Sequence, residues 1–199
     1  QLAQTRRCSV WVLPVDASAI VRDTAGMLAV SLGARCRLHA DTPTNLPSVE
    51  ADASQLQQVV MNLVLNAAES LGHAGGDVSV RTSVVEADRG LLARGYVDDD
   101  LPPGRYVAID VSDTGRGMSE DVRRRVFEPF FSTKSQGRGL GLAAALGIVR
   151  RHRGTMIVRS SAGTGTTFVV LLPASTSAVP AAAPPPAPPA PVPVSPGGL

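Results

Sequence analysis

The sequence predicts an α+β fold, a two-layer α/β sandwich with helices on one face of a mixed sheet. Apolar residues recur at spacings of three and four in some segments, as in amphipathic helices, and alternate with polar residues in others, as in strands. Glycine and proline separate these segments. The expected helices cover residues 18–32, 52–71 and 139–153, and the expected strands cover 11–15, 36–40, 50–52, 77–86, 105–112, 155–160 and 166–172.

The ends of the long central helix carry the clearest local signals. Asp52 is a natural N-cap, and Gln55 three residues later completes a pattern close to a capping box. Gly72 is placed to end this helix, as Gly33 is for the helix before it.

Composition limits the class of protein. The 199 residues are 44% hydrophobic and 18% charged, with a net charge of +2, which suits one folded domain with a real core. Only 4% are aromatic and the arginines are scattered, so no nucleic-acid partner is expected. Two distant cysteines, Cys8 and Cys36, favour reduced cytoplasm. The longest apolar run, 140–149, is well short of the roughly 20 residues that span a bilayer, so no direct membrane contact is expected.

The chain divides into three parts. Residues 1–49 are expected to form a strand, a helix and a strand that belong to the same domain as the core at 50–173. Residues 174–199 are rich in alanine and proline, which predicts a disordered linker or tail, either without a role or tethering a further domain. Because the chain starts at Gln1 rather than methionine, we expect it to begin inside a longer protein.

The long helix carries a polar stripe beside its apolar face. Asn62 and Asn66 lie one turn apart on this stripe, although asparagine is a mediocre helix former. The stripe is explained either as a solvated face or as a source of neutral oxygen ligands for Mg²⁺, which binds nucleotide phosphates with few protein ligands.

A second polar group follows the strand at 105–112. Asp113 comes at the strand end, with Gly115 and Gly117 close behind. A carboxylate there can accept a hydrogen bond from an exocyclic amine such as that of adenine, and glycines let a ring approach closely. An Asx-turn explains the same residues equally well.

A third group precedes the last helix. Residues 137–142 are glycine-rich and lead into the helix, whose first N–H groups would attract phosphate. Lys134 and Arg138 add positive charge nearby. The loop lacks the Walker spacing, and a glycine-rich loop alone is weak support for a phosphate site.

Taken in order, these segments resemble the nucleotide-binding boxes of the histidine kinase branch of the superfamily that also contains gyrase, the Hsp90 chaperones and MutL. The resemblance covers residues 50–173 and implies the Bergerat-type ATP-binding fold. The run at 130–134 is similar to kinases of the nitrogen-regulation type. The matching boxes are residues 58–69, 113–118, 127–131, 137–142 and 163–168.

The resemblance implies a role for each group. Asn66 would hold Mg²⁺, Asn62 would assist at the phosphates, and Lys134 would complete the catalytic set. Asp113 would bind the adenine amine with support from Thr167. The remaining ATP-binding residues implied by the resemblance are Gly115, Gly117, Phe131, Gly137, Arg138, Gly139, Leu140, Gly141 and Leu142. One departure is Glu69, which stands where many members place a basic residue that reaches the phosphates.

The resemblance implies transfer of the ATP γ-phosphate to a protein histidine. His39, His73 and His152 all lack the sequence context of a phosphorylated histidine, so the acceptor is expected on a separate dimerisation segment of a homodimeric kinase that serves a response regulator. An ATP-hydrolysing machine is disfavoured, because Asn62 stands where such relatives carry a general-base glutamate. A serine kinase of the anti-sigma type and an ATP-switched binding module remain as alternatives.

Overall fold

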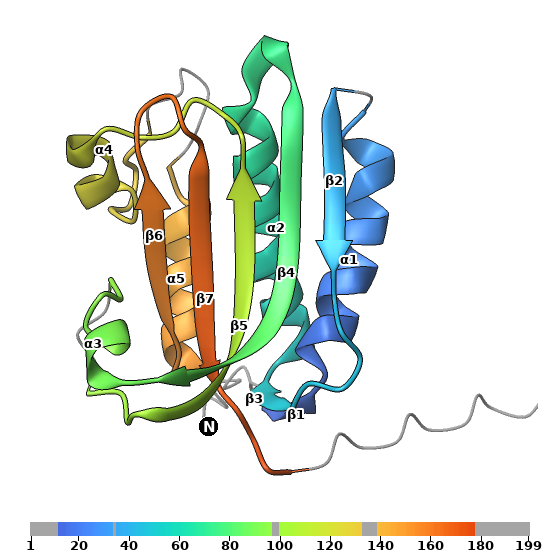
Figure 1. Ribbon diagram of the computed structural model, residues 1–199, viewed down its shortest axis with the longest axis vertical. Coiled ribbons are helices and arrows are strands. Elements are labelled where there is room, and N and C mark those ends of the chain that lie inside the picture. Colours follow the sequence, from blue (N-terminus) through green and yellow to red (C-terminus); the bar gives the residue numbers. More distant parts are fainter. Residues whose placement is uncertain (1–11, 34, 97–99, 133–138, 178–199) are drawn as a thin grey trace, which may run out of the picture.

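The computed structural model describes residues 12–33, 35–96, 100–132 and 139–177. A five-stranded mixed sheet forms one layer, with the strand order β2-β4-β5-β7-β6, in which only the pair β2 and β4 is parallel. Three helices, α1, α2 and α5, cover one face of this sheet (Figure 1). The predicted α+β sandwich with helices on one face is confirmed. The bounds are Cys36–Asp41 for β2, Gly76–Ala87 for β4, Gly104–Asp113 for β5, Thr155–Ser160 for β6, Thr166–Pro173 for β7, Ala17–Ser31 for α1, Ala53–Ser70 for α2 and Gly141–Arg151 for α5.

The main core lies between α2 and the sheet. The apolar face of α2 is almost fully buried, with side chains that are at most 2% exposed. They belong to one cluster with the helix-facing residues of β5, namely Val107, Ile109 and Val111. Burying a side chain such as Leu63 contributes about 1.5 to 3 kcal/mol, so this face fixes how α2 is rotated on the sheet. The buried residues of α2 are Leu56, Val59, Val60, Leu63, Val64 and Ala67.

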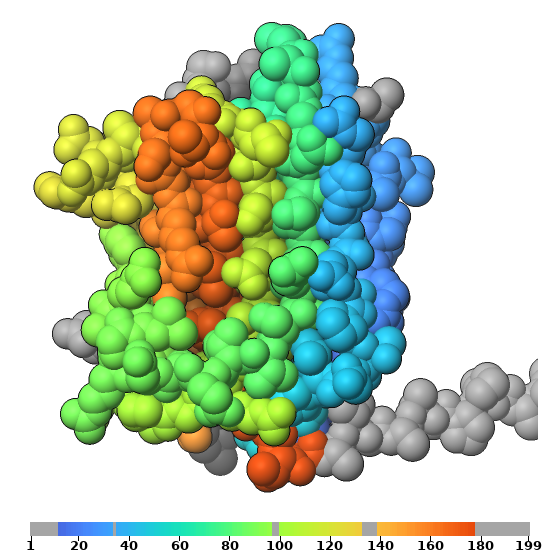
Figure 2. Space-filling view, in the orientation of Figure 1, coloured from blue at the N-terminus to red at the C-terminus, as the bar shows by residue number. Residues whose placement is uncertain are grey.

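The opposite face of the sheet is partly covered by the connection between β4 and β5. This connection contains a short helix, α3 (Arg89–Leu92), that was not predicted, because a single turn carries no helical periodicity. Leu92 packs with Tyr106 and Leu171 in a second, smaller apolar cluster. In Figure 2 the green connection covers the lower part of this face, while the strands lie open above it.

The start of α2 is joined to the end of α5 through a histidine. The Asp52 carboxylate accepts hydrogen bonds from the amides of Ser54 (2.9 Å) and Gln55 (3.2 Å), which confirms the predicted N-cap. The Ser54 hydroxyl, 2.6 Å away, is the main cause that holds the pKa of Asp52 below its ordinary value. The return bond of a capping box is absent: the Asp52 amide donates to Nε2 of His152 (3.0 Å), and Gln55 Oε1 is buried without a partner among the described residues.

The two ring nitrogens of His152 have different hydrogen-bonding roles. Nδ1 lies 2.8 Å from the Ile148 carbonyl, and since Nε2 accepts from Asp52, Nδ1 carries the proton and donates. The imidazole is only 6% exposed, so its role is structural, as expected for a histidine at a helix end.

A small second sheet contributes Val49 and Ala51 to the main core. Strands β1 (Leu13–Val15) and β3 (Val49–Ala51) pair antiparallel. Beyond Pro173 the chain continues beside β3, since Ala174 bridges to Val49 and the Ser175 amide donates to the Ser48 carbonyl (2.7 Å). Residues 178–199 of the predicted tail lie outside the described residues. No helix in the described part of the chain is long and apolar enough to cross a membrane.

The hydrogen bond between the Asp52 amide and His152 is expected to stabilise the fold. Replacing His152 with alanine is expected to lower the free energy of unfolding by about 1 to 3 kcal/mol, because the Asp52 amide loses its acceptor in a part-buried position. Urea unfolding followed by circular dichroism measures this change. The matched control is His73→Ala, at an exposed histidine, for which a change within about 0.5 kcal/mol is expected. If His152→Ala and His73→Ala changed the free energy of unfolding equally, His152 would not stabilise the contact between α2 and α5.

Candidate functional site

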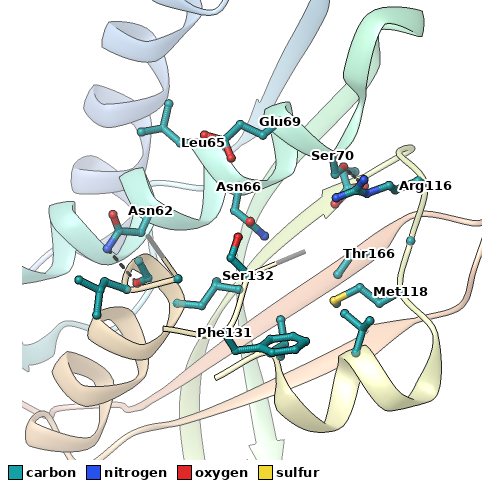
Figure 3. Close-up of a pocket in the computed structure, with 18 of the residues that line it drawn as sticks. Asn62, Leu65, Asn66, Glu69, Ser70, Arg116, Met118, Phe131, Ser132 and Thr166 are labelled. Atoms are coloured by element: carbon teal, nitrogen blue, oxygen red, sulfur yellow. Dashed lines mark hydrogen bonds between the residues drawn. The ribbon is translucent and has the colours of Figure 1, made fainter. Parts of the chain in front are cut away.

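A cavity of about 430 Å³ opens at the end of the sheet where β5 ends. Its walls come from α2, from the loop after β5, from α4 (Glu120–Arg125) and from the start of α5 (Figure 3). Three of these segments, namely α2, the loop after β5 and the start of α5, are far apart in the sequence and were singled out by their polar or glycine-rich patterns.

The α2 wall carries the paired asparagines. Asn62 and Asn66 both line the cavity, one helical turn apart, because the buried apolar face of α2 turns the polar stripe toward the opening. The Asn62 amide nitrogen donates to the carbonyl of Gly141 (3.2 Å), so α2 and α5 are hydrogen-bonded at the cavity edge (Figure 3). Glu69 also lines this wall.

The inner end of the cavity holds a buried carboxylate. Asp113 is the last residue of β5 and is 7% exposed. Its Oδ1 accepts hydrogen bonds from the Ser70 hydroxyl (2.6 Å) and from the Gly115 amide (2.8 Å). Gly115 does not line the cavity, but a Cβ at this position would overlap Ser70 Oγ, so only glycine brings this amide so close.

The loop after β5 is held by the turn that joins β6 to β7. The Gly163 amide donates to the Arg116 carbonyl (2.7 Å). Gly117 has φ +63° and lines the cavity, and a Cβ there would overlap the carbonyl oxygen of Ser161. The Met118 amide donates to the Ser160 hydroxyl (2.9 Å). These contacts make the loop a close-packed wall rather than a solvated turn.

The structure corrects the prediction for Thr167. Asp113 is paired with Thr166, while Thr167 is paired with Ser112 and bonds its hydroxyl (2.8 Å) on the other face of the sheet. Successive side chains of a strand point to opposite faces, so an offset of one residue moves the threonine out of the cavity. Thr166 lines the cavity instead, and its hydroxyl contacts that of Ser160 (2.9 Å).

The opening of the cavity is bounded by the N-terminus of α5. Gly139, Leu140, Gly141 and Leu142 all line it, as predicted for the glycine-rich segment. The N-cap residue, Leu140, makes no side-chain hydrogen bond to the first turn. A helix start without a side-chain cap leaves amide hydrogens for another acceptor, and its dipole favours an anion. Lys134, Gly137 and Arg138 lie outside the described residues.

The remaining wall is apolar and rests on aromatic packing. Val122, Val126 and Phe131 line the cavity. The Phe131 ring is covered by the guanidinium of Arg125, whose carbon lies 4.3 Å from the ring centroid. Phe127, behind this wall, packs against Tyr96 with a centroid distance of 4.5 Å.

Some cavity residues were not found from the sequence. Helix α4 was not predicted, although Ser119 caps it and Glu120 and Asp121 follow, a start signal that was available. Ser70 was also missed. It lies four residues after Asn66, so the spacing that pairs Asn62 with Asn66 places Ser70 on the same side of α2.

Known proteins with related sequences are sensor kinases. The family model described as histidine kinase-, DNA gyrase B- and HSP90-like ATPase matches residues 51–176. Sensor kinase CckA of Brucella abortus is 37% identical over 86% of this chain, and sensor histidine kinase ZraS of Escherichia coli K12 is 33% identical over 80% of it. The chain spans only 18% and 30% of the lengths of these two relatives.

Solved structures agree with this relationship. Full-length ShkA, crystallised with AMPPNP, matches with a TM-score of 0.65 and 27% identity, over 87% of this chain and 33% of that one. The catalytic domain of the histidine kinase ThkA matches in fold with a TM-score of 0.62 at 23% identity, over 82% of this chain and 95% of that one. The chain therefore belongs to the family of histidine kinase-, DNA gyrase B- and HSP90-like ATPases, as an ATP-binding catalytic domain of the histidine kinase type.

Proposed function

We propose that the cavity binds ATP with Mg²⁺ and that the domain transfers the γ-phosphate to a histidine on a phosphoacceptor segment outside this chain. One observation carries the proposal. One cavity has a buried carboxylate, Asp113, at its inner end and the N-terminus of α5, which no side chain of the described residues caps, at its opening. The first group accepts a hydrogen bond from the adenine amine, and the second attracts phosphate.

The metal would be held mainly by Asn66. No group of three or more His, Cys, Asp or Glu side chains suited to a metal ion occurs among the described residues. The side-chain oxygen of Asn66 as a protein ligand fits Mg²⁺, which is held by one or two protein oxygens together with substrate phosphates and water. Bound there, Mg²⁺ would neutralise charge on the phosphate oxygens. Asn62 would assist at the phosphates, and its hydrogen bond to the Gly141 carbonyl at the start of α5 supports this role.

The walls supply positioning rather than acid or base chemistry. Phosphoryl transfer depends on alignment and charge neutralisation, and it requires little covalent chemistry from the protein. The position one turn before Asn66 is occupied by the amide of Asn62, which takes no proton from water. This favours transfer to a partner over hydrolysis. Glu69 on the same wall is acidic, so positive charge at the phosphates is left to Lys134 and Arg138, whose placement is a prediction.

The partner assignments rest on the relatives. They are sensor kinases much longer than this chain, which supports a phosphoacceptor segment in the same homodimeric kinase and a response regulator downstream. Use of ATP supports a cytoplasmic location. The histidines of this chain do not serve as acceptors in the proposal, because none of them lines the cavity and His152 is buried in the junction of α2 and α5. Membership of the nitrogen-regulation branch stays a prediction.

Metal binding is tested by replacing Asn66 with alanine. We expect the Kd for ATP to rise about tenfold in Mg²⁺ and to change little in EDTA, because the side chain acts through the metal. Isothermal titration calorimetry under both conditions measures the difference. The matched control is Gln58→Ala, at an exposed residue about two turns earlier on α2, which should bind as the wild type does. A loss of the same size in Mg²⁺ and in EDTA would contradict the metal role of Asn66.

Phosphotransfer is tested by mixing the chain with the separately expressed phosphoacceptor segment of the same kinase and γ-labelled ATP. We expect an acid-labile label on the histidine of that segment, no label with Asp113→Ala, and slow ATP hydrolysis by the chain alone. An acid-stable label would indicate a serine kinase, and rapid hydrolysis without transfer would indicate an ATPase. Either result overturns the histidine kinase assignment.

A further inference from the structure

We propose that Ser70 is a positioning residue for adenine recognition, which holds the Asp113 carboxylate so that Oδ2 faces the bound base. The proposal rests on the proposed function and names a residue through which the cavity distinguishes a 6-amino purine. Ser70 is the last residue of α2 (Figure 3). Both Ser70 and Asp113 line the cavity.

The hydroxyl of Ser70 makes a short bond to the carboxylate. Its oxygen lies 2.6 Å from Asp113 Oδ1, within the range of hydrogen bonds to a charged acceptor. The same hydroxyl lies 2.8 Å from the Ala67 carbonyl, the ordinary acceptor for a serine near a helix end. A hydroxyl has one proton and donates it to one acceptor at a time. The shorter distance and the charge of the carboxylate favour donation to Asp113 over donation to the Ala67 carbonyl.

The Asp113 carboxylate accepts a second hydrogen bond, also at Oδ1. The Gly115 amide donates to this atom at 2.8 Å. Within the described part of the chain, both hydrogen bonds of the carboxylate use Oδ1, and Oδ2 is left for a ligand. Two donors from different elements, α2 and the loop after β5, fix the rotation of the carboxylate about its Cβ–Cγ bond. One donor alone would leave that rotation freer.

The packing around Ser70 gives its hydroxyl a defined place. A Cβ on Gly115 would overlap Ser70 Oγ, and the Arg116 amide donates to the Ser70 carbonyl at 3.4 Å. The backbone and the side chain of Ser70 therefore both contact the loop that carries Asp113. An alanine at position 70 keeps the helix and the close packing but removes the donor.

Two ligands that differ only in the 6-amino group can show whether Ser70 orients the Asp113 carboxylate or only shapes the cavity. ATP has a 6-amino group that donates to Oδ2, whereas purine riboside triphosphate has the same ring and phosphates without this amine. If Ser70 acts by orienting Asp113, its loss weakens only the ligand with the amine. A residue that merely shapes the cavity would affect both ligands equally.

The test is the affinity of wild type and Ser70→Ala for the two triphosphates, measured by calorimetry in Mg²⁺. We expect the Kd for ATP to rise about threefold to tenfold in Ser70→Ala, the size of one hydrogen bond, and the Kd for purine riboside triphosphate to stay within about twofold. The matched control is Ser112→Ala, one residue before Asp113, whose hydroxyl contacts Thr167 on the other face of the sheet. This control should bind both ligands as the wild type does.

Each other outcome overturns the inference. Equal weakening of both ligands would show that Ser70 shapes the cavity without orienting Asp113, and unchanged affinity for both would show that its bond is unimportant. Thermal unfolding in the absence of ligand confirms that Ser70→Ala is folded, so loss of structure is distinguished from loss of orientation. A wild type that binds neither triphosphate would instead reject the proposed function.

Discussion

The site depends on the hydrogen-bonded junction between the end of α2 and the end of β5. Asp113 is the last residue of β5 and Ser70 is the last residue of α2. The Ser70 hydroxyl oxygen lies 2.6 Å from Asp113 Oδ1. This contact depends on the burial of the apolar face of α2 in a core that it shares with β5, because that burial fixes the rotation of the helix over the sheet. The junction at the other end, where Asp52 meets His152, holds the start of α2 to α5. The hydrogen bonds at both ends of α2 hold the helix so that its polar side lines the cavity.

The cavity has two ends with different construction. The inner end is close-packed backbone, in which Gly115, Gly117 and Gly165 each lie where a Cβ would overlap a neighbouring carbonyl or hydroxyl. Such a wall suits recognition of a flat base, because its donors and acceptors are fixed before binding. The outer end is formed by Asn62, Asn66 and the first turn of α5, whose N-cap residue, Leu140, makes no side-chain hydrogen bond to that turn. In the proposed function, phosphates and a metal ion would complete that end.

Much of this arrangement was available from the sequence. The periodicity of α2 identified both its buried face and its polar stripe, and the order of the glycine-rich segments indicated the family. The position of Thr167 was predicted wrongly, because a motif read along one strand does not define its register with β5, and a shift of one residue reverses the face. Ser70 was overlooked because a serine at a helix end is ordinary by itself. Its importance comes from Asp113, 43 residues away, and only the fold brings the two together. The short helix α3 was missed because a single turn carries no periodicity, whereas the start signal of α4, Ser119 followed by two acidic residues, was available.

A crystal structure of this chain with Mg²⁺ and a non-hydrolysable ATP analogue would test the nucleotide site most directly. We expect the adenine amine within hydrogen-bond distance of Asp113 Oδ2, the phosphates at the first turn of α5, and Mg²⁺ on the side-chain oxygen of Asn66. A nucleotide bound with its base away from Asp113, or with its phosphates away from α5, would contradict the proposed site.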